Sequence, residues 1–125
     1  MRFALELHDS EVRDVTLEDG VARVRFAAAS VRTTDGARGW LPGVMLALSE
    51  ATLLGDNTPL AFGRLAEGRL RHDDRDIPRL ALPGTLSGRL ELTLRFANGT
   101  LLTLRGRTLA PSMPDDALFK EDLSC

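Results

Sequence analysis

The chain has 125 residues, about the length of one average domain, and its hydrophobic fraction of 43% and charged fraction of 27% are those of an ordinary globular protein. Its formal net charge of −2 argues against nucleic acid as a partner, because binding to phosphates needs a concentrated basic surface. The longest apolar run extends from Val44 to Leu48, far short of the ~20 residues of a membrane-spanning helix, so no membrane partner is expected.

The N-terminal residues contain no apolar signal segment, and the one cysteine, Cys125, cannot form an internal disulfide. We therefore expect a cytoplasmic protein with a single domain over residues 1–125, its strands within about 2–110 and a tail at 111–125. The spacing of the His, Asp and Glu residues predicts neither a metal site nor a cofactor site.

His8, Asp9 and Ser10 combine the three residue types of a hydrolytic triad. On an extended chain His8 and Ser10 face one way and Asp9 the other, so the sequential hydrogen bonds of a triad cannot form. We expect a structural turn instead, in which Asp9 and Ser10 bond nearby backbone amides and reverse the chain between Leu7 and Val12.

The segment from Val12 to Phe26 predicts a β-hairpin with Asp19 and Gly20 as a two-residue loop. This register puts Arg13 opposite Phe26, which the sequence does not explain. It also makes three favourable pairs: Val15 with Val24 and Leu17 with Ala22 inside, and Asp14 with Arg25 outside.

Glycines and prolines predict a loop from Thr33 to Pro42, and within it Trp40 and Leu41 are the candidate binding residues. An exposed indole could anchor a partner, since Trp is enriched at binding hot spots. We favour the alternative, a partly buried indole that folds inward and closes one end of the sheet structure. The following segment, Val44 to Leu54, is ambiguous between helix and strand, and we favour a buried strand.

Leu60 to Arg71 predicts a strand interrupted at Gly63 or Gly68, and Ile77 to Leu82 predicts an edge strand because of Pro78. Between them, His72 to Asp76 forms a polar turn whose one His and three Asp lack the spacing of a calcium loop. We expect a solvated turn there rather than a metal site.

Glu50 and Glu67 lie within apolar segments and are the carboxylates to examine for acid–base chemistry. Each is more simply explained as a strand residue that points outward.

Leu86 to Leu109 predicts the clearest hairpin, with a three-residue loop in which Asn98 precedes a left-handed Gly99. A one-residue slip would move every side chain to the wrong face. This register leaves one unfavourable pair, Arg89 opposite Arg107. Its favourable pairs are Leu94 with Leu102, Leu92 with Leu104, Thr93 with Thr103, and Glu91 with Arg105.

Pro111 should end the strands, and Met113 to Leu123 predicts a short C-terminal helical turn with acids at its start. The chain as a whole therefore predicts an all-β fold, an antiparallel β-sandwich or partly closed barrel of about seven to nine strands.

The opening from Leu5 to Val12, with its His-Asp-Ser turn, and the hairpin segment from Leu94 to Leu101 resemble small bacterial all-β proteins that have not been characterised. Some proteins with a similar opening are grouped with the immunity proteins of bacterial toxin systems. The resemblance covers only part of the chain. It implies an all-β fold in a bacterial cytoplasm and carries over no catalytic residue.

These observations favour a non-catalytic binding or interaction domain, whose partner is a second copy in a homodimer, through an exposed strand edge, or another protein. One alternative is an immunity-type protein that binds and blocks a toxin. A further alternative is an enzyme with a pocket at one end of the barrel that holds Glu50 or Glu67.

Overall fold

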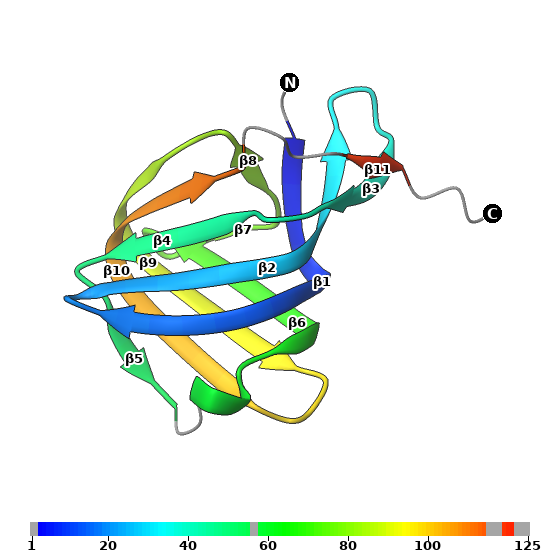
Figure 1. The fold of residues 1–125 in the computed structure, drawn as a ribbon. Coiled ribbons are helices and arrows are strands. Elements are labelled where there is room, and N and C mark those ends of the chain that lie inside the picture. The colour runs from blue at the N-terminus through cyan, green and yellow to red at the C-terminus, as the bar shows by residue number, and fades with distance from the viewer. Residues whose placement is uncertain (1–2, 56–57, 115–118, 122–125) are drawn as a thin grey trace.

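A computed structural model describes residues 3–55, 58–114 and 119–121 (Figure 1). These residues form eleven strands of one sheet and a single 3-10 turn, η1 (Thr58–Leu60), so the all-β expectation is confirmed. None of them belongs to a helix that could cross a membrane. The strands are β1 (Phe3–Glu18), β2 (Val21–Thr33), β3 (Arg38–Leu41), β4 (Met45–Ser49), β5 (Thr52–Leu54), β6 (Gly63–His72), β7 (Arg75–Ile77), β8 (Leu80–Leu82), β9 (Leu86–Phe96), β10 (Leu101–Ser112) and β11 (Lys120–Glu121).

Six strands close into an antiparallel barrel, in the order β1, β2, β4, β10, β9 and β6. The ring closes where β6 meets β1, through the pairs Glu11 with Arg64 and Val12 with Gly63. The other strands extend this ring: β3 and β11 continue beyond β2, β8 lies beside β1, β5 beside β10, and β7 beside β6 (Figure 1). Of the two expected architectures, a sandwich and a partly closed barrel, the structure has a barrel, but the barrel is closed and the eleven strands exceed the seven to nine expected.

Both predicted hairpins have the predicted registers, down to each favourable cross-strand pair. Asp19 and Gly20 have φ angles of 52° and 75°, as a primed two-residue turn requires, and Gly99 has a φ of 93°. One detail differs, because Leu17 lies near the tip of its hairpin and is 43% exposed rather than inside.

Two β-bulges remove the unfavourable pairs. A register shift between Val12 and Asp14 leaves Arg13 out of the ladder and pairs Phe26 with Val12. A second shift, between Gly106 and Thr108, takes Arg107 out of register with Arg89, whose guanidinium lies 2.9 Å from the Asp74 carboxylate instead. Because a bulge adds one residue to one strand, it also moves the apolar residues that follow it to the inner face.

The loop expected at Thr33–Pro42 is shorter than predicted. β2 extends to Thr33, a turn follows, and Arg38–Leu41 forms β3, which pairs with β2. The segment from Val44 to Leu54 is extended, as we favoured, but it is divided into β4 and β5 at Glu50, whose φ is 50°.

The next expected strand, Leu60 to Arg71, is also shorter. Leu60 ends η1, the strand begins at Gly63, and its irregularity is a bulge between Leu65 and Glu67 rather than a break at Gly68. Pro78 lies between β7 and β8, and β8 is an edge strand as expected.

Two expectations at the C-terminal end are wrong. Pro111 lies within β10, opposite Leu46, which is tolerated because β10 has only one neighbouring strand beyond Leu109. The helical turn is not found in the described residues, since Lys120 and Glu121 form a strand, β11. Residues 115–118 and 122–125, on which part of that prediction rests, lie outside the described ranges.

Side chains fill the barrel. Leucine, valine and phenylalanine from all six barrel strands form one buried cluster, to which Ala61, beside η1, also belongs. An enclosed space among Leu5, Leu70, Leu92 and their neighbours has a volume of about 10 Å³, roughly that of one water molecule. The interior is a packed core rather than a ligand cavity.

The observed register predicts that Leu92→Asp lowers the free energy of unfolding by several kcal/mol, because it buries an unpaired charge. Leu92 is 1% exposed and pairs with Leu104. Its neighbour Thr93 faces outward, so Thr93→Asp is the matched control and should change stability by less than about 1 kcal/mol. Urea denaturation measures both, and equal losses would contradict the register.

Candidate functional site

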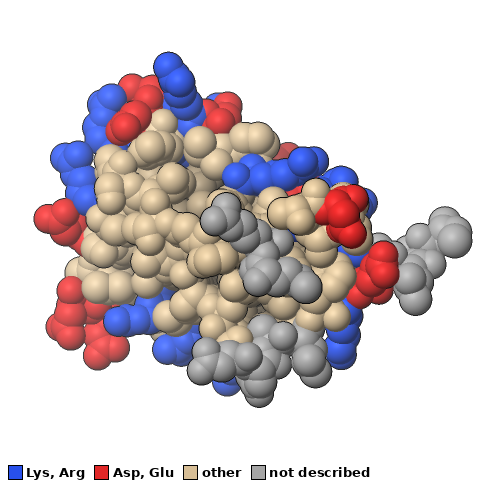
Figure 2. Space-filling view, turned by 90° about the horizontal axis from the view of Figure 1, so that it is seen from above, with Lys and Arg blue, Asp and Glu red and all other residues tan. Residues whose placement is uncertain are grey.

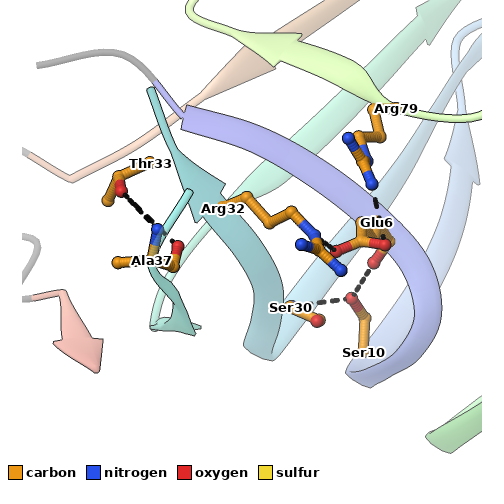
Figure 3. Close-up of polar contacts among 7 residues, drawn as sticks. All are labelled: Glu6, Ser10, Ser30, Arg32, Thr33, Ala37 and Arg79. Carbon is orange, nitrogen blue, oxygen red and sulfur yellow. Dashed lines mark hydrogen bonds and ion pairs between the residues drawn. The ribbon is translucent and has the colours of Figure 1, made fainter. Parts of the chain in front are cut away.

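His8, Asp9 and Ser10 lie in a large bulge of β1 and not in a chain reversal, so that part of the expectation is wrong. β1 pairs with β2 on both sides of the bulge, Glu6 with Ser30 and Glu11 with Ala28. Between these pairs β1 advances by more residues than β2, and the excess forms the bulge. The curved ribbon of β1 in Figure 3 shows the resulting bend.

The Ser10 hydroxyl is fully buried and satisfies the backbone at the bulge (Figure 3). It donates a hydrogen bond to the Glu6 carbonyl at 2.7 Å and accepts one from the Ser30 N–H at 2.8 Å. Because its one proton is directed at a backbone carbonyl, the hydroxyl is not arranged as a nucleophile activated by histidine. This geometry supports the structural role proposed for Ser10.

His8 and Asp9 turn toward β6. The His8 Nδ1 lies 3.0 Å from the Ala66 carbonyl, which only accepts, so Nδ1 donates the proton. The Asp9 carboxylate lies 3.3 Å from Arg64, and 3.3 Å from the His8 Nε2. Both side chains thus join the bulge of β1 to β6 at the seam where the barrel closes.

An ion-pair cluster lies on the outer face beside the bulge (Figure 3). The Arg32 Nε lies 2.7 Å from one Glu6 oxygen, and the Arg79 Nε lies 3.9 Å from the other. Glu6 therefore connects β1 to β2 and to the segment that precedes β8. Both Glu6 oxygens face a cation, and the cluster stabilises the bend rather than offering a free carboxylate.

Trp40 and Leu41 lie on opposite faces of β3. Leu41 is 1% exposed and belongs to the core, so it is not available to a partner. Trp40 is half-buried, and it alternates with the buried Gly39 and Leu41, which puts its indole on the outer face. The indole is partly buried, as expected, but it does not close an end of the barrel. Ser30 of β2 and Lys120 of β11 flank it.

The polar turn at His72–Asp76 joins β6 to β7, and its side chains bind β9. Asp73 and Asp74 have φ angles of 49° and 67°. The Asp73 carboxylate accepts a hydrogen bond of 2.8 Å from the Arg89 backbone N–H, which lowers the pKa of Asp73, and His72 Nε2 donates one to Ser87. Among the described residues, no group of three His, Cys, Asp or Glu side chains is placed to hold a metal ion.

A groove of about 340 Å³ crosses the outer face of β6, β9 and β10. Its charges are mostly paired: Arg105 lies 2.9 Å from Glu91, and Arg89 lies 2.9 Å from Asp74. Such exposed pairs contribute little stability and leave little net charge for a ligand. Basic and acidic side chains are likewise interspersed around the face seen in Figure 2. The groove is lined by Glu50, Thr52, Arg71, Asp74, Arg89, Leu90, Glu91, Arg105, Gly106 and Arg107.

Glu50 and Glu67 are both exposed. Glu50 lies at the turn between β4 and β5, and Glu67 lies 3.6 Å from Arg95 on the outer face. Neither carboxylate is buried in a pocket, which general acid–base catalysis by a carboxyl with a shifted pKa requires.

Four large apolar side chains gather at one end of the barrel, which we name the apolar end: Leu54, Leu60, Phe62 and Leu101. They are 47–52% exposed. Leu54 and Gly55 adjoin Leu101, since a Cβ on Gly55 would lie 2.8 Å from the Leu101 carbonyl, and Asn98 donates a hydrogen bond of 2.9 Å to the Leu60 carbonyl. Figure 1 shows β5, η1 and the β9–β10 loop together at the lower end of the barrel.

The sequence analysis did not select this apolar end as a candidate site. One signal was present, because the hairpin register that pairs Leu94 with Leu102 also pairs Leu101 with Arg95 on the outer face. Leu54, Leu60 and Phe62 carry no such signal, since their exposure depends on how β5 and η1 meet the barrel.

Comparisons with known proteins give no match: no family model, no curated protein and no solved structure is similar to this chain at a significant level. The function must therefore be argued from these surfaces.

We predict that Ser10→Ala lowers the free energy of unfolding by about 2 kcal/mol, because it leaves the buried Ser30 N–H without an acceptor. Ser112→Ala, at an exposed position of β10, is the control and should change stability by less than about 0.5 kcal/mol. Thermal and urea denaturation measure both. A Ser10→Ala protein as stable as the control would show that the hydroxyl does not support the bulge.

The Asp73 carboxylate should make the free energy of unfolding depend on pH. Its folded-state pKa lies below the ordinary value of 3.8, so the carboxylate stabilises the fold above that pH. This contribution is lost as the pH falls through the folded-state pKa. The stability difference between wild type and Asp73→Ala should therefore shrink in acid when urea denaturation is repeated from neutral pH downward.

Asp73→Asn is the control for this titration. Asparagine tolerates the positive φ and can still accept the Arg89 N–H, but it does not ionise. The difference between Asp73→Asn and Asp73→Ala should not change with pH. A wild-type advantage that persists unchanged in acid would contradict the role of the Asp73 charge.

Proposed function

We propose that this chain is a non-catalytic protein-binding domain that pairs with a second copy of itself through the apolar end. The observation that carries the proposal is the grouping of Leu54, Leu60, Phe62 and Leu101, about half-exposed, on one end of the barrel. Their exposed surface is on the order of 400 Å², the size at which a patch on a monomer often has a function. A standard interface buries about 800 Å² per partner, so this patch is large enough to form the apolar centre of such an interface.

The open edge of β5 supports a second copy as the occupant. Within the described ranges β5 pairs only with β10, so its other edge offers backbone N–H and C=O groups next to Leu54. An antiparallel pair of identical edges is self-complementary about a twofold axis, and such symmetric dimers are the commonest oligomers. Burial of the leucines beside the paired edges would supply the hydrophobic contribution that a short strand pair lacks.

The packed interior supports binding over catalysis. Small-molecule sites are usually concave, mostly apolar pockets with a few convergent polar groups. In this barrel leucine, valine and phenylalanine fill the interior, and the carboxylates considered for acid–base work lie on the surface. The side chains of His8, Asp9 and Ser10 are engaged with neighbouring strands.

An immunity-type protein remains the second candidate, and it differs from the first in its partner, a toxin. The residues that support it are those of the N-terminal motif. Ser10 bonds the backbone of the bulge, and Asp9 lies on the seam. Because both residues have structural roles, the resemblance of this motif to immunity proteins is evidence for a shared fold more than for a shared toxin partner. Either function suits a cytoplasmic protein, the location that we propose.

The proposal predicts that sedimentation shows a monomer at low concentration and a dimer at high concentration. Leu54→Asp should weaken the dimer by at least about tenfold in Kd, because it places a charge at the apolar centre of the interface. Ala81→Asp is the matched control, since Ala81 is exposed on β8, a different edge strand, and this variant should dimerise like wild type.

Circular dichroism establishes that each variant is folded. A wild-type chain that stays monomeric at high concentration would contradict self-association. A dimer that Leu54→Asp leaves intact and Ala81→Asp breaks would place the interface at β8 instead.

A further inference from the structure

The edge of β3 carries a second binding arrangement, away from the apolar end. Residues Phe119–Glu121 lie along this edge, with Lys120 opposite Trp40 and Glu121 opposite Gly39. Figure 1 shows β3 and β11 at the upper right of the barrel and β5 at the lower left. The chain's own C-terminal segment therefore occupies a strand edge that is otherwise open.

A slot for an aromatic ring adjoins this edge. The Lys120 carbonyl and the Phe119 ring both lie over Gly39, and a Cβ added there would clash with the carbonyl and come within 2.5 Å of the ring, closer than side chains tolerate. The ring centroid also lies 5.5 Å from that of Phe3, and the two rings are tilted by 33°, at a separation typical of aromatic pairs. Gly39 is buried, and Phe119 packs against the core. Only glycine at position 39 leaves room for the backbone of β11 and for the ring.

The attachment of β11 is small. Two residue pairs join β11 to β3, whereas four join β3 to β2. A strand this short has little stability of its own, so the Phe119 ring contributes most of what holds the segment in place. Such a segment can be replaced by another that offers the same groups.

We infer that the β3 edge is a binding site for an extended segment of a partner protein, and that Phe119–Glu121 occupies the site in its absence. The partner segment adds a strand to β3 and inserts an aromatic side chain into the slot between Gly39 and Phe3, as peptides do when they augment a sheet edge. The next residue of the segment lies beside Trp40 on the outer face, where Lys120 lies now. This half-buried indole gives the site the kind of residue that dominates binding hot spots.

The occupied site makes binding competitive. A tethered segment acts at an effective concentration on the order of millimolar, so a free peptide must displace it. Weakening the tethered segment therefore strengthens binding of a free one. This relation tests whether the edge and its slot accept a free strand.

The test uses the full chain and a synthetic peptide of its residues 114–125 with Cys125→Ser. Trp40 is the only tryptophan, the chain has no tyrosine, and the peptide has neither, so Trp40 emission reports the site directly. Phe119→Ala in the full chain should bind this peptide on the order of tenfold more tightly than wild type does, with a change in Trp40 emission. A peptide that itself carries Phe119→Ala should not bind, and neither should a scrambled peptide.

Gly39→Ala, added to the Phe119→Ala chain, should abolish binding, because the added Cβ would clash with the backbone of the bound strand and with its aromatic ring. If Gly39→Ala disturbs folding, the Phe119→Ala peptide still tests the slot without changing the protein. Equal binding of the two peptides, or no gain in the Phe119→Ala chain, would overturn the inference. Dimers formed through exchange of this segment, with no binding of free peptide, would overturn it in favour of a second copy as the occupant.

The measurement is repeated in a Leu54→Asp background, where dimers through the apolar end should be weakened. Because β3 and β5 lie apart, peptide binding should be unchanged there (Figure 1). Failure of the peptide to bind would then leave the proposed dimer intact, and failure of the dimer would leave peptide binding intact.

Discussion

The fold depends on the bulge of β1, where one strand changes neighbours without losing its hydrogen bonds. Before the bulge β1 pairs with β2 and β8, and after it with β2 and β6. At the edge of this bulge the Ser30 N–H donates its hydrogen bond to the Ser10 hydroxyl instead of to a backbone carbonyl. Without that acceptor a buried N–H would lack a hydrogen bond, at a cost comparable to that of a core mutation.

Closure at this seam decides where function can lie. A six-stranded barrel leaves an interior that side chains fill, so chemistry on a bound small molecule has no cavity there. Binding can instead take place on the outer surface, where the strands that do not belong to the six-stranded ring lie. β5 leaves an open edge beside exposed leucines, and β3 carries the C-terminal segment on its edge. Both are short strands added to the ring, and an edge strand of this kind can pair with another chain.

Local patterns sufficed where a turn sets the register. Asp19–Gly20 and Asn98–Gly99 determine the turn geometry, and alternation then determines every pair of their hairpins. The Arg89–Arg107 mismatch was itself a sign of the bulge. Gly106 and Leu109 both belong to the inner side of β10 although they are three positions apart, and strict alternation would place them on opposite sides, so one extra residue lies between them. The sequence thus determined the all-β class, the two hairpins and the apolar face of each.

Only the tertiary structure decided which segments distant in the chain pair, and with that the candidate sites. A four-residue strand such as Arg38–Leu41 is too short for alternation to separate it from a loop, and its partner β2 decides its structure. The same pairing sends Leu41 into the core and Trp40 outward. Leu54 ends the segment expected to be a buried strand, and Leu60 begins the next expected strand, yet both are about half-exposed, one in β5 and the other in η1. Local preference sets the conformation of a turn, but burial and edge pairing depend on contacts between distant segments, which hold only once the ring is closed.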